Sequence, residues 1–221
     1  MNNVYELIKK GIREKKPYSF NEVIMDVKLN QNESPYDVPE YVKQKVFERF
    51  VSRAWNRYPS INGLPLRKAI GAYLNIPVER LAVGVGSGEL LENVASIVLG
   101  SDKTAFIVEP TFQVYRQLAL VNESQLLTRE LSADFSYPVD EIVRVLRDNK
   151  IDLFIIAAPN NPTGTPIDVD ALEYIIKSAG GFVCVDEAYF EFSGVTVTRL
   201  SSGIKKEPYS ENEALETSEN I

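Results

Sequence analysis

The chain has 221 residues, 44% of them hydrophobic and 25% charged, which is the composition of an ordinary soluble globular protein with a buried core. A net charge of -7 without a basic stripe argues against nucleic-acid binding, and the lack of histidine together with a single cysteine, Cys184, excludes histidine-based triads, internal disulfides and His-ligated metals. No apolar run reaches about 18 residues and the N-terminus lacks a signal-peptide pattern, so the sequence predicts a cytoplasmic protein with no membrane association.

The first third of the chain alternates polar loops with short helices. Residues 1–16 have helical spacing interrupted by Gly11, which indicates a marginal amphipathic helix or arm. Asn- and Pro-rich segments predict loops at 28–39 and 56–65, and apolar periodicity predicts helices at 39–52 and 66–75.

From residue 81 the pattern becomes a regular alternation of strands and helices. The predicted strands are 81–86, 104–110, 124–131, 151–159 and 181–189, and the predicted helices are 87–99, 112–121, 138–149 and 169–179. Near-continuous apolar runs such as Phe154–Ile156 and Phe182–Val185 are typical of parallel strands covered on both faces. The predicted fold class is therefore α/β, a three-layer αβα sandwich with a mostly parallel sheet.

Three regions are expected along the chain. Residues 1–38 form an N-terminal arm, helix and loop, and residues 39–200 form part of a large domain. Residues 201–221 are polar, acidic at the end and almost without apolar periodicity, which predicts a disordered tail.

Two glycine- and aromatic-containing segments are candidates for ligand contact. The run Gly84–Val94 leaves a strand and opens a helix, so its backbone N–H groups suit a phosphate; the alternative is a tight turn with Ser87 as N-cap. Phe112, in EPTFQVY, is placed to stack on a planar ring, or alternatively to pack in the core.

Two further segments follow the last two predicted strands. In APNNPTGTP the amide of Asn161 can donate to a phenolic oxygen, at the edge where open α/β sheets bind ligands. In CVDEAYFEF a carboxylate, Asp186, closes an apolar strand, so it requires a partner such as a protonated ring nitrogen; the alternative is a cap for the next turn. Tyr189 can reach the same ligand, Glu187 is interpreted as a bystander, and Cys184 as a small buried hydrophobe.

The order of these segments, with N-N-P-T-G followed by D-E-A-Y, resembles the fold-type-I, class I/II pyridoxal-phosphate aminotransferases. The segments LNQNESPYDVP, RYPS, GSGELL, EPTFQVY and DEAY-x-EF are similar to the histidinol-phosphate aminotransferase branch, over about residues 25 to 200. This resemblance implies pyridoxal 5′-phosphate as cofactor, an amino donor and a phosphorylated keto substrate as small-molecule partners, histidine biosynthesis as the setting, and a homodimer.

The resemblance also implies roles for individual residues. Asn161 and Tyr189 would bond the cofactor's 3′-oxygen, Asp186 would pair with the pyridinium nitrogen, and Phe112 would stack on the ring. Gly86, Ser87 and Gly88 would bind the phosphate, although relatives usually carry Asp in place of Gly88. Tyr58 would reach the phosphate of the neighbouring subunit's cofactor, and Asn30 and Tyr36 would line the substrate entrance.

The family's Schiff-base lysine and small C-terminal domain have no counterpart in the sequence. Lys205 and Lys206 are the only lysines after DEAY, and they come too early and lack an apolar setting. The sequence therefore predicts no catalytic residue and no metal ligand within this chain, a large domain truncated before the lysine, and weak, non-covalent cofactor binding. The alternatives to an aminotransferase are a non-catalytic remnant or dimer partner, and a threonine-phosphate decarboxylase-like lineage.

Overall fold

The computed structural model describes residues 4–13 and 27–198, which belong to two units. One unit is Lys15–Val83, and the other combines Met1–Glu14 with Gly84–Ile221. The expected boundaries at residues 38 and 200 stay a prediction, and the expected disordered tail, 201–221, lies outside the described residues.

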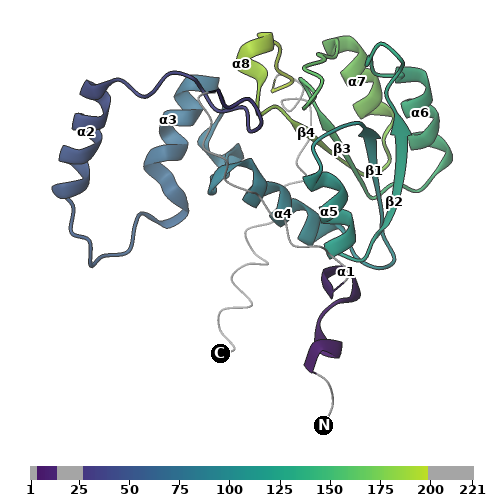
Figure 1. Cartoon of the computed structure of the whole chain (residues 1–221), viewed down its shortest axis with the longest axis horizontal. Helices are drawn as coiled ribbons and strands as arrows, with labels where there is room; N and C mark the ends of the chain where they lie inside the picture. The colour runs from purple at the N-terminus through teal and green to yellow at the C-terminus, as the bar shows by residue number, and fades with distance from the viewer. Residues whose placement is uncertain (1–3, 14–26, 199–221) are drawn as a thin grey trace, which may run out of the picture. The chain divides into compact units, whose positions relative to one another are not determined.

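A four-stranded parallel sheet forms the centre of the larger unit (Figure 1). Its strands are β1 (Thr104–Glu109), β2 (Gln125–Glu130), β3 (Leu153–Ala157) and β4 (Phe182–Asp186), arranged in the order β2-β1-β3-β4. The connecting helices are α4 (Gly86–Val98), α5 (Val114–Val121), α6 (Val139–Asp148) and α7 (Val169–Ser178), and the short α8 (Phe190–Ser193) follows β4. The predicted α/β class is confirmed.

Helices cover both faces of this sheet, as the alternation of side chains along each strand requires. Phe106, Phe154 and Ile156 point toward α6 and α7, whereas Ala105, Ile107 and Ile155 point toward α4 and α5. The two resulting clusters confirm the predicted three-layer αβα arrangement.

Two predictions about strands are corrected by the structure. Residues 81–85 form no strand: Val85 is 92% exposed, and this segment has no partner strand within the described chain. The strand β4 is shorter than predicted and only partly buried, with Phe182 66% exposed, because β4 pairs only with β3 among the described strands. An apolar sequence alone does not reveal whether a strand has one neighbour or two.

Short helices account for most of the remaining described structure. The unit Lys15–Val83 contains α2 (Glu40–Val51), η2 (Ile61–Gly63), α3 (Leu64–Leu74) and η3 (Val78–Arg80). In this unit the Trp55 indole donates to the Phe50 carbonyl at 3.0 Å, and the two rings lie 4.7 Å apart. The predicted N-terminal helix is reduced to η1 (Val4–Leu7) and α1 (Lys10–Arg13) within the described residues. No described helix has both the length and the apolar character that a bilayer crossing needs.

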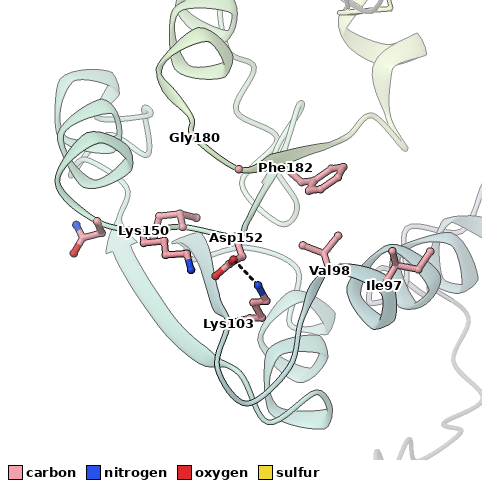
Figure 2. A pocket seen from close by; sticks show the side chains of 10 residues that line it. Ile97, Val98, Lys103, Lys150, Asp152, Gly180 and Phe182 are labelled. Carbon is pink, nitrogen blue, oxygen red and sulfur yellow. Dashed lines mark ion pairs between the residues drawn. The ribbon is translucent and has the colours of Figure 1, made fainter. Parts of the chain in front are cut away.

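A pocket of about 420 Å³ lies at the edge where the strands begin (Figure 2). It is bounded by the end of α4 and by residues that precede or open β1, β3 and β4. Asp152 lies 3.3 Å from Lys103 here and accepts a hydrogen bond from the Thr104 amide at 2.9 Å, which connects the starts of two strands. None of the predicted site residues lines this pocket, so the candidate site lies elsewhere.

The start of β4 provides a test of packing at this edge. A Cβ added to Gly181 would lie 2.2 Å from the Ile151 carbonyl oxygen, whereas one added to the adjacent Gly180 would meet no atom of the described residues within 4 Å. We expect Gly181→Ala to lower the free energy of unfolding by about 2 kcal/mol, since backbone must shift to admit the methyl group. Gly180→Ala, the matched control, should change it by no more than about 0.5 kcal/mol in urea unfolding. Equal effects of the two substitutions would show that the close approach does not control stability.

Candidate functional site

The predicted ligand-binding segments meet at the edge where the parallel strands end. Phe112 follows β1, Asn161 follows β3, and Asp186 closes β4. The connection from the end of α4 to the start of β1 lies at the opposite edge, so the first turn of α4 lies at this one. We call Gly86–Gly88 with Phe112, Asn161, Asp186 and Tyr189 the carboxyl-edge site.

A buried tyrosine, Tyr115, holds the carboxylate of this site. Its hydroxyl donates to Asp186 Oδ2 at 2.7 Å, and its side chain is 1% exposed. The two residues meet because Asp186 points to the same face of the sheet as Cys184, the face that α5 covers. Asp186 Oδ1 accepts a hydrogen bond from the Ala188 amide at 3.0 Å. These contacts fix the carboxylate in one orientation at the end of β4.

Electrostatics keep Tyr115 in its role of donor. Burial, followed by the charge of Asp186, holds the pKa of Tyr115 well above its usual value, so the hydroxyl stays neutral. A carboxylate has about four lone-pair positions. With Tyr115 and the Ala188 amide bonded, Asp186 still has acceptor capacity for a cationic group.

An aromatic side chain lies beside this pair. The ring of Phe112 meets the ring of Tyr115 edge to face, with centroids 5.7 Å apart and an interplanar angle of 87°. Phe112 is 37% exposed, so part of its surface is open to a ligand rather than buried in the core. Its exposure favours the ring-contact interpretation over core packing.

The first turn of α4 has the features of an anion site. The helix has no side-chain N-cap bond, so Ser87 does not cap it as the alternative interpretation required. A Cβ added to Gly86 or Gly88 would meet no atom of the described residues within 4 Å, so these residues leave space beside the first amides. The amide of Val85 is already taken by Glu89, so the donors that remain are those of residues 86–88 and the Ser87 hydroxyl.

Asn161 and Tyr189 lie in the loops that follow β3 and β4. Asn161 is half-buried, and its side-chain amide has no hydrogen-bonding partner within the described part of the chain. Tyr189 is also half-buried, and its ring lies 6.5 Å from that of Phe192. Their proposed contacts with a phenolic oxygen stay predictions.

The remaining predicted site residues belong to the unit Lys15–Val83. Tyr58 is fully exposed, Tyr36 is 85% exposed, and Asn30 is exposed. Their roles toward a neighbouring subunit and a substrate entrance stay predictions. Lys205 and Lys206 lie outside the described residues, and among those that are described no group of three or more acidic or cysteine side chains could hold a metal ion.

Sequence reasoning missed the contacts of three residues in or next to this site. The role of Tyr115 could have been predicted in part from the sequence. Its helical spacing with Leu118 and Ala119 indicates that it is buried, and a buried hydroxyl requires a hydrogen-bonding partner. Glu187, interpreted as a bystander, accepts hydrogen bonds from the Val197 amide at 2.7 Å and the Thr196 hydroxyl at 3.0 Å. Asn160 was passed over for its neighbour Asn161, although it is the buried one of the two.

Cys184 has the environment of an unreactive thiol. Burial, followed by the charge of Asp186, raises its pKa from 9.0 to about 11. The folded chain thus retains this proton to a higher pH than the unfolded chain does, and the stability contributed by the thiol is present below pH 9 and lost as the pH rises toward 11.

We therefore expect slow alkylation of Cys184 in the folded chain. At a pH below 9, the raised pKa of Cys184 leaves about 100-fold less thiolate in the folded chain than in the unfolded chain. The measurement is the iodoacetamide reaction rate as a function of pH, with the urea-unfolded chain as the reference. Equal alkylation rates for the folded and unfolded chains near neutral pH would contradict the raised pKa of Cys184.

Comparison with known proteins identifies similar sequences and folds. The family model for aminotransferase class I and II matches residues 24–207. Histidinol-phosphate aminotransferase of Chlorobium phaeovibrioides is 40% identical over 169 residues, covering 76% of this chain and 46% of its own length. The enzyme of the same name from Chlorobaculum tepidum is 38% identical over 170 residues, covering 76% and 48%. The chain thus spans about half the length of the curated relatives it matches.

Solved structures show the same fold. The histidinol-phosphate aminotransferase of Clostridium acetobutylicum aligns with a TM-score of 0.60 and 25% identity, over 72% of this chain and 46% of its own. Cystalysin of Treponema denticola, which contains pyridoxal 5′-phosphate, aligns with a TM-score of 0.62 and 12% identity, over 71% and 42%.

Proposed function

The chain belongs to the class I and II aminotransferase family, and from this premise we propose that its carboxyl-edge site binds pyridoxal 5′-phosphate. The proposed activity of the protein is amino transfer from glutamate to a ketone of the imidazole-acetol phosphate type, as a histidinol-phosphate aminotransferase. The names and the 38–40% identity of the relatives from Chlorobium phaeovibrioides and Chlorobaculum tepidum support this substrate class.

Three features of the site suit a phosphorylated planar ring. The space beside Gly86 and Gly88 admits a phosphate next to helix amides that bond to none of the described residues. The amide of Asn161 is available to donate to an oxygen on the ring. The partly exposed Phe112 offers an apolar surface for a ring face.

One observation carries the proposal: the carboxylate of Asp186 is fixed by a neutral donor, Tyr115, beside an exposed aromatic ring. A carboxylate oriented in this way would direct its charge at a cationic partner and would favour the protonated form of a ring nitrogen. When bound, pyridoxal phosphate supplies an electron sink for a carbanion, and this protonation strengthens it.

The chain's other residues bind and orient. Asn161 and Tyr189 would donate to the ring oxygen and orient the ring. Phe112 covers one face and excludes water from it. The amides of residues 86–88 and the Ser87 hydroxyl anchor the phosphate. All these contacts are non-covalent.

The proposed assembly is a homodimer. The support is that Tyr58 is fully exposed in the described structure and is thus free to meet a second copy of the chain. In the proposal its hydroxyl donates to the cofactor phosphate bound by that copy.

Binding of pyridoxamine 5′-phosphate tests the proposal. This ligand has the ring and phosphate of the cofactor but no aldehyde, so it reports the non-covalent site alone. We expect saturable binding to the purified chain by isothermal titration calorimetry, with pyridoxamine lacking the phosphate as the weaker control ligand. No saturable binding up to about 1 mM, a free energy of about 4 kcal/mol, would contradict the proposed site.

A further inference from the structure

A single buried amide connects two loops of the carboxyl-edge site. Asn160 is 2% exposed, and, tyrosines aside, it is the only polar or charged residue among the described residues that is buried. Its Oδ1 accepts a hydrogen bond from the Thr111 hydroxyl at 2.8 Å, and its Nδ2 donates to the Pro110 carbonyl at 2.9 Å and to the Thr163 hydroxyl at 2.8 Å. A buried amide is costly unless it is bonded, and here both ends of the amide are bonded.

These bonds join the segment after β1 to the segment after β3. Thr111 directly precedes Phe112, and Asn160 directly precedes Asn161. The paired register of β1 and β3 ends at Ile107 and Ile155, so backbone pairing between these strands does not extend to the two loops. The side chain of Asn160 provides the connection beyond that point.

Asn160 also closes its own loop. The backbone N–H of Asn160 donates to the Thr165 carbonyl at 2.8 Å, and the backbone carbonyl of Asn160 accepts from the Gly164 N–H at 2.8 Å. The Thr163 hydroxyl, which accepts from Asn160, lies 2.9 Å from the Thr165 hydroxyl. The loop is therefore fixed internally and fixed to its neighbour by the same residue.

We propose that Asn160 is a positioning residue that sets the spacing between Phe112 and Asn161 in the ring-binding half of the site. The inference rests on the proposed function, in which Phe112 covers the ring face and Asn161 donates to the ring oxygen. An amide suits this position because one planar group supplies both an acceptor for Thr111 and donors for Pro110 and Thr163. Aspartate supplies no donor, and alanine supplies neither.

Ligand binding to matched variants tests the proposal. Asn160→Ala removes all three side-chain bonds, and Thr111→Val removes one of them from the opposite loop while preserving shape. Asn122→Ala is the control, because it also deletes a hydrogen bond donated by a side-chain amide. That bond runs from Asn122, at the end of α5, to the Leu118 carbonyl at 2.9 Å. We expect pyridoxamine 5′-phosphate to bind about tenfold more weakly to Asn160→Ala, severalfold more weakly to Thr111→Val, and unchanged to Asn122→Ala.

A second probe separates positioning from general loss of structure. The amides of residues 86–88 belong to α4 and make no bond to Asn160, so inorganic phosphate, titrated by phosphorus NMR, should bind all variants as it binds the parent chain. A further substitution, Phe112→Ala, should reduce the tenfold effect of Asn160→Ala, because the residue being positioned is then gone. Equal losses for both ligands, or a full tenfold effect without the Phe112 ring, would overturn the proposal.

A measurement without ligand keeps the inference separate from the proposed function. Asn160→Ala and Thr111→Val should both shift the NMR signals of the Phe112 ring and the Asn161 amide, whereas Asn122→Ala should leave them unchanged. If the parent chain binds no pyridoxamine 5′-phosphate, the proposed function fails, and these signals alone decide whether Asn160 positions the two loops. Unshifted signals in both variants would overturn it, and Thr111→Val gives this answer even if Asn160→Ala does not fold.

Discussion

Replacing Asp186 with asparagine is expected to weaken the binding of pyridoxamine 5′-phosphate by about 10- to 100-fold, the value of one hydrogen bond between charged groups. Asparagine has nearly the shape of aspartate and can still accept the hydrogen bond that Tyr115 donates at 2.7 Å, although its NH2 group then replaces the oxygen that accepts from the Ala188 amide. It loses the negative charge that would hold a proton on the ring nitrogen. The substitution thus removes the charge and one accepted hydrogen bond, and it preserves the shape of the side chain and its contact with Tyr115.

The neighbouring carboxylate provides the matched control. Glu187 accepts hydrogen bonds from the Val197 amide and the Thr196 hydroxyl on its two different oxygens. In glutamine, Oε1 can still accept from the Val197 amide and Nε2 can donate to the Thr196 hydroxyl, whose own proton can be donated to the Thr198 hydroxyl. Glu187→Gln should therefore change the dissociation constant by less than about twofold. Calorimetry with the two variants in parallel decides the matter. If Asp186→Asn binds the ligand as tightly as Glu187→Gln does, Asp186 is not the partner of the ring nitrogen.

The comparison of sequence and structure shows which signals are local and which are not. The strand and helix positions from residue 104 onward followed from periodicity, because each element buries a face whose spacing is visible in its own residues. The loops of the site were also predictable, since parallel strands bring their carboxyl ends to one edge of the sheet. Phe112, Asn161 and Asp186 were placed at that edge for this reason, and the structure places them there.

The failures depend on contacts between distant residues. The segment 81–85 has strand-like residues, but a strand exists only where another pairs with it, and none of the described strands does. Glu187 and Asn160 have unremarkable local sequences, and their roles come from partners ten and forty-nine residues away. Tyr115 is the intermediate case. Its burial was predictable from the sequence, but the identity of its hydrogen-bonding partner depends on how α5 packs on the sheet.

Loss of the Phe154 ring is expected to have the largest effect on stability. Phe154, the second residue of β3, is 0% exposed, and its ring stacks on Phe106 of β1 at 4.8 Å with an interplanar angle of 22°. It lies beneath α6 and α7, where Ile142 and Ile175 are equally buried. Replacement by alanine removes the apolar surface of the ring and leaves a cavity that helices packed on a parallel sheet can fill only in part.

We expect Phe154→Ala to lower the free energy of unfolding by about 3–5 kcal/mol, measured by urea denaturation of the chain. Phe182→Ala is the control, because it makes the same chemical change on the same sheet at a side chain that is 66% exposed. Its cost should be no more than about 1 kcal/mol, within the range of strand preference. Similar losses for both variants would mean that the face of the sheet covered by α6 and α7 is not the principal core. A large loss confined to Phe154→Ala would show that the layer between the sheet and helices α6 and α7 provides most of the stability of this unit. The same layer supports the ends of β1 and β3, where the site lies.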